Sequence, residues 1–355
     1  MVMPNISEKK ARQEIPHHLG ELLGASQENM DVRGQISTEN GPRATADMLV
    51  DVAGFSFAVE WRGANSLPSI ASGIEGLQEL NLDGAIPLLA VPYMTPTGAE
   101  RCKNAEISWL DLSGNAHIVA PGLRIHVEGK PNQYTRRGRP SNIFAPKSSR
   151  VARHLLRFPE ETFFQKEIAE HTGLSEGYAS QVVGRLEEAS LLYRDTDGRV
   201  GVRDPDLLLD SWREKYDFQK HHIQRGRVAA HSGKELVDKV ADTLARRDIS
   251  YATTGLSGAW LIDGFASFRT ATFYLRTAPT DEALREIRFH EGERGANLWL
   301  VLPNDEGVFH GVDRRRDIDH VHPLQVYLDL KGHPERSDEA ASHLRKTTLQ
   351  WSTDD

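Results

Sequence analysis

The stretch FQKEIAEHTGLSEGYASQVVGRLEEASLLYRDTDGRVGV, residues 164–202, decides how the middle of this chain folds. Its first part predicts a short helix that ends at Gly173, and Ser175 is placed to cap a second helix. Two short strands follow at 191–194 and 199–202, joined by a tight turn that contains Asp-Gly. Four apolar residues of the second helix have the i, i+3, i+4, i+7 spacing of one buried stripe: Ala179, Val182, Val183 and Leu186.

Helix, turn, helix and two-stranded wing is the order of a winged helix-turn-helix, which we assign to residues 150–216. Such a domain places its second helix in the major groove of DNA. Arg and Gln form paired hydrogen bonds with guanine and adenine edges. A winged helix used only for protein contact or dimerisation is the alternative. The side chains placed for base or phosphate contact are Tyr178, Ser180, Gln181, Arg185, Arg194 and Arg199.

Positive charge is concentrated just before this domain. Seven basic residues and no acidic residue lie between Arg136 and Arg157, in a chain whose net charge is −8. A local cationic stretch in an acidic protein favours a polyanion at one site, because phosphates attract Lys and Arg. We expect residues 133–149 to be a basic arm, although a solvated linker has the same composition. The additional candidates for DNA contact are Arg136, Arg137, Arg139, Lys147, Arg150 and Arg153.

Residues 31–132 alternate strand-like and helix-like segments, which predicts a small α/β domain preceded by a mobile tail at 1–30. Asp51 and the run Glu60-Trp61-Arg62 resemble the strand-borne Asp and Glu-x-Lys of metal-dependent nucleases, whose carboxylates hold Mg²⁺. Arg62 replaces the lysine, and arginine differs from lysine in shape and cannot lose its proton. We expect a restriction-endonuclease-like fold kept for binding or dimerisation. The alternative is a Mg-dependent DNA endonuclease that uses this domain.

Several classes of site and location are excluded by composition. The single cysteine, Cys102, excludes an internal disulfide framework and a cysteine-based zinc cluster. No run approaches the roughly 18 apolar residues of a membrane span, so we expect a cytoplasmic protein without membrane contact. We predict no metal and no cofactor. The histidines of two polar segments are expected to be solvated rather than metal ligands: His221, His222, His231, His320 and His322.

Phrases spread along the chain resemble a known family. They are WLDLSGNAHI (109–118), the winged helix at 164–202, GANLWLVLP (295–303) with GVFHGV (307–312), and HPLQVYLDL (322–330). Together they resemble AbiEi-type antitoxin-like transcriptional regulators of type IV toxin–antitoxin systems. The resemblance implies a DNA-binding repressor, often of its own operon, with a nucleotidyltransferase-like toxin as partner. Many such antitoxins begin with the DNA-binding module, whereas about 130 residues precede it here, so DNA binding carries over more directly than toxin neutralisation.

The last part of the chain, residues 217–335 with a polar tail at 336–355, reads as a second α/β domain. The segment YATTGLSGA, residues 251–259, looks like the Gly-Ser turn that opens a nucleotidyltransferase fold. Active members hold Mg²⁺ with paired carboxylates on the next strand, but the matching stretch 268–274 contains no Asp or Glu. We therefore expect a degenerate nucleotidyltransferase-like domain without activity.

Taken together, the sequence predicts a multidomain α/β protein that is not an enzyme. We expect a repressor that binds double-stranded DNA as a homodimer, because one winged helix reads too few base pairs to find its operator in a genome. Toxin neutralisation by protein contact alone is a further alternative.

Overall fold

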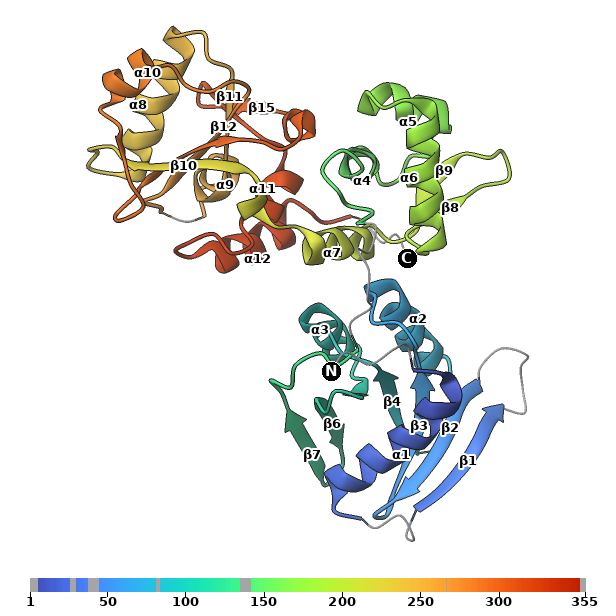
Figure 1. Ribbon diagram of the computed structural model, residues 1–355. Helices are drawn as coiled ribbons and strands as arrows, with labels where there is room; N and C mark the ends of the chain where they lie inside the picture. Colours follow the sequence, from blue (N-terminus) through green and yellow to red (C-terminus); the bar gives the residue numbers. More distant parts are fainter. Residues whose placement is uncertain are drawn as a thin grey trace. The chain divides into compact units, whose positions relative to one another are not determined.

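The computed structural model describes residues 6–25, 30–37, 45–80, 84–134, 142–265 and 267–351. The chain divides into two compact units, residues 1–141 and 142–355 (Figure 1). Both units mix helices and strands, as the composition pattern predicts.

The first unit consists of α1 (Glu8–Leu23), β1 (Met30–Ser37), β2 (Thr45–Val52), β3 (Phe55–Trp61), α2 (Leu67–Gln78), β4 (Ile86–Val91), α3 (Pro96–Asn104), β5 (Ser108–Asp111), β6 (Ala116–Ala120) and β7 (Leu123–Val127). The strands form one sheet in chain order. β1, β2 and β3 are antiparallel neighbours, β3, β4 and β5 are parallel, and β5, β6 and β7 are antiparallel again.

Helices cover both faces of this sheet, which explains the continuous apolar run of β4. Leu88 and Ala90 share a core with α1, whereas Leu89 and Val91 share a core with α2. Successive strand residues point to opposite faces, so β4 is buried on both. The strands of both cores lie within 31–132, where the alternating pattern predicts an α/β domain.

The N-terminal helix corrects the prediction of a mobile tail at 1–30. Residues 8–23 form α1, which contributes Ala11, Ile15 and Leu19 to the core of the first unit. The Ser7 hydroxyl caps its start by accepting the N–H of Lys10 at 3.3 Å. The three buried positions have a four-residue spacing and lie on one helix face. Polar neighbours and Pro16 hide this stripe in the sequence.

The second unit begins with the winged helix-turn-helix: α4 (Ser149–Arg157), α5 (Gln165–Thr172), α6 (Glu176–Glu188), β8 (Leu192–Arg194), β9 (Val200–Val202) and α7 (Pro205–Lys215). The order and the antiparallel wing confirm the prediction from 164–202. Asp204 caps α7 by accepting the N–H of Leu207 at 2.9 Å, and Pro205 occupies the first helical position.

The rest of the second unit is another mixed sheet with helices. Its elements are η2 (Phe218–Lys220), β10 (His222–Arg227), α8 (Gly233–Arg246), β11 (Tyr251–Thr254), α9 (Gly255–Asp263), β12 (Ala271–Leu275), α10 (Asp281–Ile287), β13 (His290–Glu291), β14 (Leu298–Leu302), η3 (Glu306–Phe309), β15 (Asp313–Arg315), β16 (Ile318–His320), α11 (Pro323–Asp329) and α12 (Ser337–Thr347). The strand order is β13-β10-β14-β12-β11-β16-β15.

The C-terminal helix corrects the prediction of a polar tail at 336–355. α12 contacts α9 and α11, and it buries Ala340, Ala341 and Leu344. Small apolar residues carry this contact, so the segment looks polar when its composition is averaged. Among the described residues, no helix is long and apolar enough to cross a membrane.

Candidate nucleic-acid interface

The helix-turn-helix is built around the predicted stripe of α6. Ala179, Val183 and Leu186 are completely buried and Val182 is almost so. α5 ends at Gly173, whose φ of 65° lies in the left-handed region that glycine adopts readily. Only residues 173–175 separate the two helices. This short turn and the buried stripe fix which face of α6 is turned outward.

The outward face of α6 carries polar side chains at its centre. Ser180 and Gln181 are exposed, and Tyr178 and Arg185 are half-buried. The Tyr178 hydroxyl lies 2.9 Å from the Ser148 hydroxyl, and the ammonium of Lys147 lies 5.6 Å from the centre of the Tyr178 ring. These contacts hold the chain that enters α4 beside the first turns of α6. The arm residues Arg136, Arg137 and Arg139 fall outside the described part of the chain.

Both wing arginines bind within the domain. Arg194 forms an ion pair with Glu187 at 3.0 Å and donates to the Gly198 carbonyl at 2.8 Å. Arg199 donates to the Thr162 carbonyl at 3.0 Å, and its guanidinium lies 4.3 Å from the centre of the Phe164 ring. A phosphate contact by either side chain would compete with these bonds.

Two arginines of α4 are buried, although the charge pattern of the sequence predicts that they contact DNA. Arg150 is 7% exposed and forms a bidentate ion pair with Asp305, both bonds measuring 2.8 Å. Arg153 is 3% exposed and donates to the Gln325 side-chain carbonyl at 2.6 Å. Neither guanidinium faces solvent, so the structure corrects their assignment to DNA contact. They join the winged helix to the C-terminal sheet region.

Comparison with known families gives two matches. Residues 145–200 match the model of the MarR family, and residues 199–350 match a family described as transcriptional regulator, AbiEi antitoxin, type IV TA system. The chain is therefore similar to the MarR family over its winged helix and to AbiEi-type regulators over residues 199–350, which we call the AbiEi-type region. No curated protein and no solved structure matches the chain significantly. The two family matches support a DNA-binding transcriptional regulator, and neither supports the endonuclease alternative.

A buried polar network links the AbiEi-type region to the winged helix. Gln325 of α11 accepts from Arg153 and donates to Asp329 at 2.6 Å. The Asp329 carboxylate also accepts from Tyr274 at 3.0 Å and from the hydroxyls of Tyr216 and Thr254. Burial raises the pKa of Asp329 to about 6, even though these donors stabilise its ionised form.

Two members of the network, Gln325 and Asp329, belong to HPLQVYLDL, the phrase that carries much of the family resemblance. Gln325 and Asp329 are four residues apart, so they lie on the same face of α11. That spacing is the signal in the sequence, but the apolar residues around it make the segment look like ordinary core-forming sequence. The structure therefore shows that these two residues belong to a buried polar network.

Two predicted solvated histidines are buried in the AbiEi-type region. His221 is 7% exposed, lies 2.9 Å from the Tyr216 hydroxyl and accepts the N–H of Asn304 at 3.1 Å. Burial lowers its pKa to about 4. His320 is 2% exposed. His222 and His231 are exposed, as predicted. No described group of three or more His, Cys, Asp or Glu side chains is placed to hold a metal ion.

The described winged helix is not basic as a whole. Residues 142–216 contain eleven Lys and Arg side chains against thirteen Asp and Glu. Several of the cations are also engaged, since Arg150 and Arg153 are buried and the wing arginines bind within the domain. The net charge of this range therefore gives little long-range attraction to phosphates.

The nuclease-like motif of the first unit is arranged differently from the prediction. β2 pairs with β3 so that Met48 faces Val59 and Asp51 faces Ser56. Asp51 is therefore at the far end of the hairpin from Glu60, and its carboxylate accepts from Ser56 and Arg33. Asp47 takes the neighbouring place instead, accepting the Trp61 N–H at 2.8 Å. Arg62 forms an ion pair with Glu60 at 2.5 Å. The arginine that stands where the nuclease motif has lysine therefore balances the charge of this carboxylate.

Proposed function

We propose that this protein represses transcription by placing α6 in the major groove of operator DNA. The observation that carries the proposal is the exposed centre of α6, where Ser180 and Gln181 stand opposite a completely buried stripe. Gln181 supplies both the donor and the acceptor that read adenine, and Arg185 can reach a guanine or a phosphate. The MarR-family match over the same residues supports this role.

The affinity is divided between two parts of the chain. Because residues 142–216 have a small acidic excess, α6 supplies sequence recognition and little net attraction. The arm with Arg136, Arg137 and Arg139 supplies the phosphate contacts, helped by the exposed Lys147 beside α6. Removing these counterion-releasing contacts weakens binding to every sequence alike.

The protein binds its operator as a homodimer in this proposal. A homodimer presents two recognition helices to a two-fold symmetric operator, which provides the specificity that one helix lacks. The AbiEi-type match supports a toxin partner, and we infer that this toxin is nucleotidyltransferase-like and is engaged by residues 217–335.

The flanking domains serve binding in this proposal. The meander β1–β3 followed by a parallel β4 is consistent with a restriction-endonuclease-like fold, and the Glu60–Arg62 pair favours a unit without nuclease activity. The strand after the Gly-Ser turn, β12, is completely buried and carries no carboxylate, which favours an inactive nucleotidyltransferase-like domain.

Binding of the full-length protein to the DNA upstream of its own gene tests the function. Fluorescence anisotropy at low salt, with and without Mg²⁺, is expected to show specific binding without cleavage. Gln181→Ala should cost about 1–3 kcal/mol of specific binding and leave binding to unrelated DNA unchanged. Gln350→Ala, the same change at an exposed position outside the winged helix, is the matched control.

Three results would contradict the proposal. If Gln181→Ala binds the upstream DNA as tightly as the unaltered protein does, α6 does not recognise the operator sequence. Mg-dependent cleavage that is lost in Glu60→Ala would establish an endonuclease instead. The protein could also bind no DNA and still protect cells from a co-expressed toxin. If Arg185→Ala leaves that protection unchanged, neutralisation by protein contact alone would be established.

A further inference from the structure

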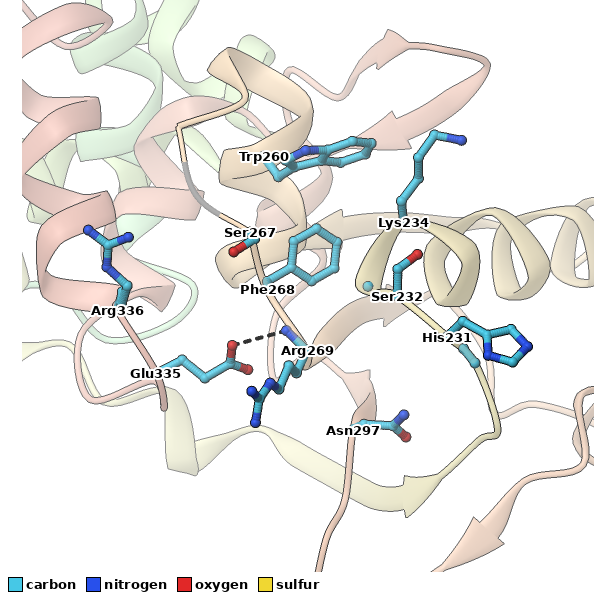
Figure 2. Close-up of a pocket in the computed structure, with 12 residues that line it drawn as sticks. His231, Ser232, Lys234, Trp260, Ser267, Phe268, Arg269, Asn297, Glu335 and Arg336 are labelled. Carbon is cyan, nitrogen blue, oxygen red and sulfur yellow. Dashed lines mark hydrogen bonds between the residues drawn. The ribbon is translucent and has the colours of Figure 1, made fainter.

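A polar hollow of about 760 Å³ lies in the C-terminal sheet region (Figure 2). It is bounded by the start of α8, by Trp260 of α9, by the segment 267–269 that leads into β12, and by Glu335 and Arg336 before α12. Its volume is within the range of pockets that hold small ligands. Neither family match nor the proposed DNA contact assigns it a role.

Three cationic side chains line the hollow: Lys234, Arg269 and Arg336. Its single carboxylate, that of Glu335, is already hydrogen-bonded. Glu335 accepts the backbone N–H of Arg269 at 3.0 Å and that of Thr270 at 2.8 Å. Among the described residues, Lys234 pairs with Asp238 and Arg336 pairs with Glu339, and such exposed ion pairs are weak. The hollow therefore offers an excess of positive charge.

Arg269 is the strongest anion-binding candidate among these cations. Figure 2 shows its side chain between Glu335 and Asn297. Within the described residues, its guanidinium has no hydrogen bond or ion pair. An arginine with its donors free matches the geometry of a phosphate, which it can bind with two parallel hydrogen bonds.

The opposite wall is aromatic. The rings of Trp260 and Phe268 lie 5.7 Å apart, and the exposed Arg316 guanidinium lies 4.5 Å from the centre of the Trp260 ring. Stacking of a nucleobase on an aromatic side chain is a stronger interaction than an exposed cation–π contact of this kind. A planar base would therefore displace Arg316 from the indole.

We propose that this hollow binds a nucleoside phosphate, with its phosphates at Arg269 and its base at Trp260. Both wall types are needed for this ligand class, since cations alone fit any anion and aromatic rings alone fit any planar group. The lining residues include a single carboxylate, and Mg-dependent nucleotide transfer needs a pair. The site therefore binds the nucleotide and does not transfer it.

Isothermal titration of the full-length protein with ATP in EDTA tests this inference. We expect binding that weakens at least tenfold in Arg269→Gln and in Trp260→Leu. Arg285→Gln removes the same charge from an exposed ion pair on α10 and should bind ATP as the unaltered protein does. Circular dichroism melting curves of the variants separate loss of binding from loss of folding.

Adenosine and inorganic triphosphate are the two partial probes, and each should bind more weakly than ATP. Triphosphate binding as tight as ATP binding would overturn the role of the base. Failure of millimolar ATP, GTP, CTP and UTP to bind would overturn the site, and so would ATP binding that Arg269→Gln leaves unchanged. Binding of an oligoglutamate peptide in place of all four nucleotides would assign the hollow to an acidic segment of a protein partner. None of these outcomes depends on whether the protein binds DNA.

Discussion

The ion pair between Arg150 and Asp305 distinguishes a structural arginine from a DNA-binding one. Arg150 lies in the cationic run that precedes the winged helix, where sequence favours a phosphate contact. The structure instead gives it two 2.8 Å bonds to Asp305 and one of 3.2 Å to the Thr172 carbonyl. Arg150→Gln should therefore destabilise the second unit and leave the salt dependence of DNA binding unchanged.

The magnitude follows from the burial of both partners. The Arg150 and Asp305 side chains are 9% and 11% exposed, so removing one charge leaves the other largely without water. Breaking a buried pair costs about 3–5 kcal/mol, and the residual exposure favours the lower end, about 3 kcal/mol. Asp305→Asn should cost a similar amount. The double variant should cost clearly less than the sum of the single changes, because the second change removes the unpaired charge.

Hydrogen exchange measured by mass spectrometry, followed in peptides from α4 across a urea series, is the suitable assay because it reports on the second unit separately. Arg203→Gln, at an exposed arginine of the same domain, is the matched control and should leave protection unchanged. Unaltered protection of α4 in Arg150→Gln, together with a weaker salt dependence of DNA binding, would refute the assignment of this arginine.

Three further predictions concern the buried groups. Stability of the second unit should fall as the pH drops below 6.5 towards 4, because burial lowers the folded-state pKa of His221 and His333 to about 4. At pH 5 each costs about 2 kcal/mol, offset by about 1 kcal/mol from Asp329, whose raised pKa favours its acid form; an unchanged calorimetric melting temperature between pH 7.5 and 5 would contradict this. Cys102 is completely buried and its pKa is raised to about 12, so a chromogenic disulfide reagent should react with it only after unfolding, and immediate reaction would contradict its burial. Gln325→Leu leaves a buried guanidinium and a buried carboxylate each without one partner, and should lower the unfolding free energy by about 2–3 kcal/mol in urea titrations; wild-type stability would show that the bridge contributes little.

The winged helix was predictable because its signals are local. The α6 stripe, the glycine that ends α5 and the Asp-Gly turn of the wing each occupy a few consecutive residues. The roles of Arg150 and Arg153 were not predictable, because their partners Asp305 and Gln325 are 155 and 172 residues away along the chain. Charge counting alone cannot separate an arginine that faces solvent from one that pairs with a side chain far along the sequence.

The register of the strands in the first unit could likewise not be predicted from the sequence. The alternation of apolar residues predicts the β2–β3 hairpin, but it does not say which carboxylate faces Glu60. A two-residue turn at Ala53 and Gly54 sets that pairing and brings Asp47, not Asp51, beside Glu60. The N-terminal helix and α12 were missed for a different reason, since each buries small or widely spaced apolar residues within a polar segment.

We propose that the basic arm supplies the phosphate contacts and that α6 recognises the operator sequence. The salt dependence of operator binding tests this claim most directly. The affinity of the full-length protein is measured between 50 and 200 mM salt, alongside a variant with glutamine at Arg136, Arg137 and Arg139. The slope of log affinity against log salt should become shallower by about 0.9 for each arginine–phosphate pair that the variant removes, about 2.7 in all, while the preferred operator sequence stays the same. An unchanged slope, or a changed sequence preference, would contradict the account.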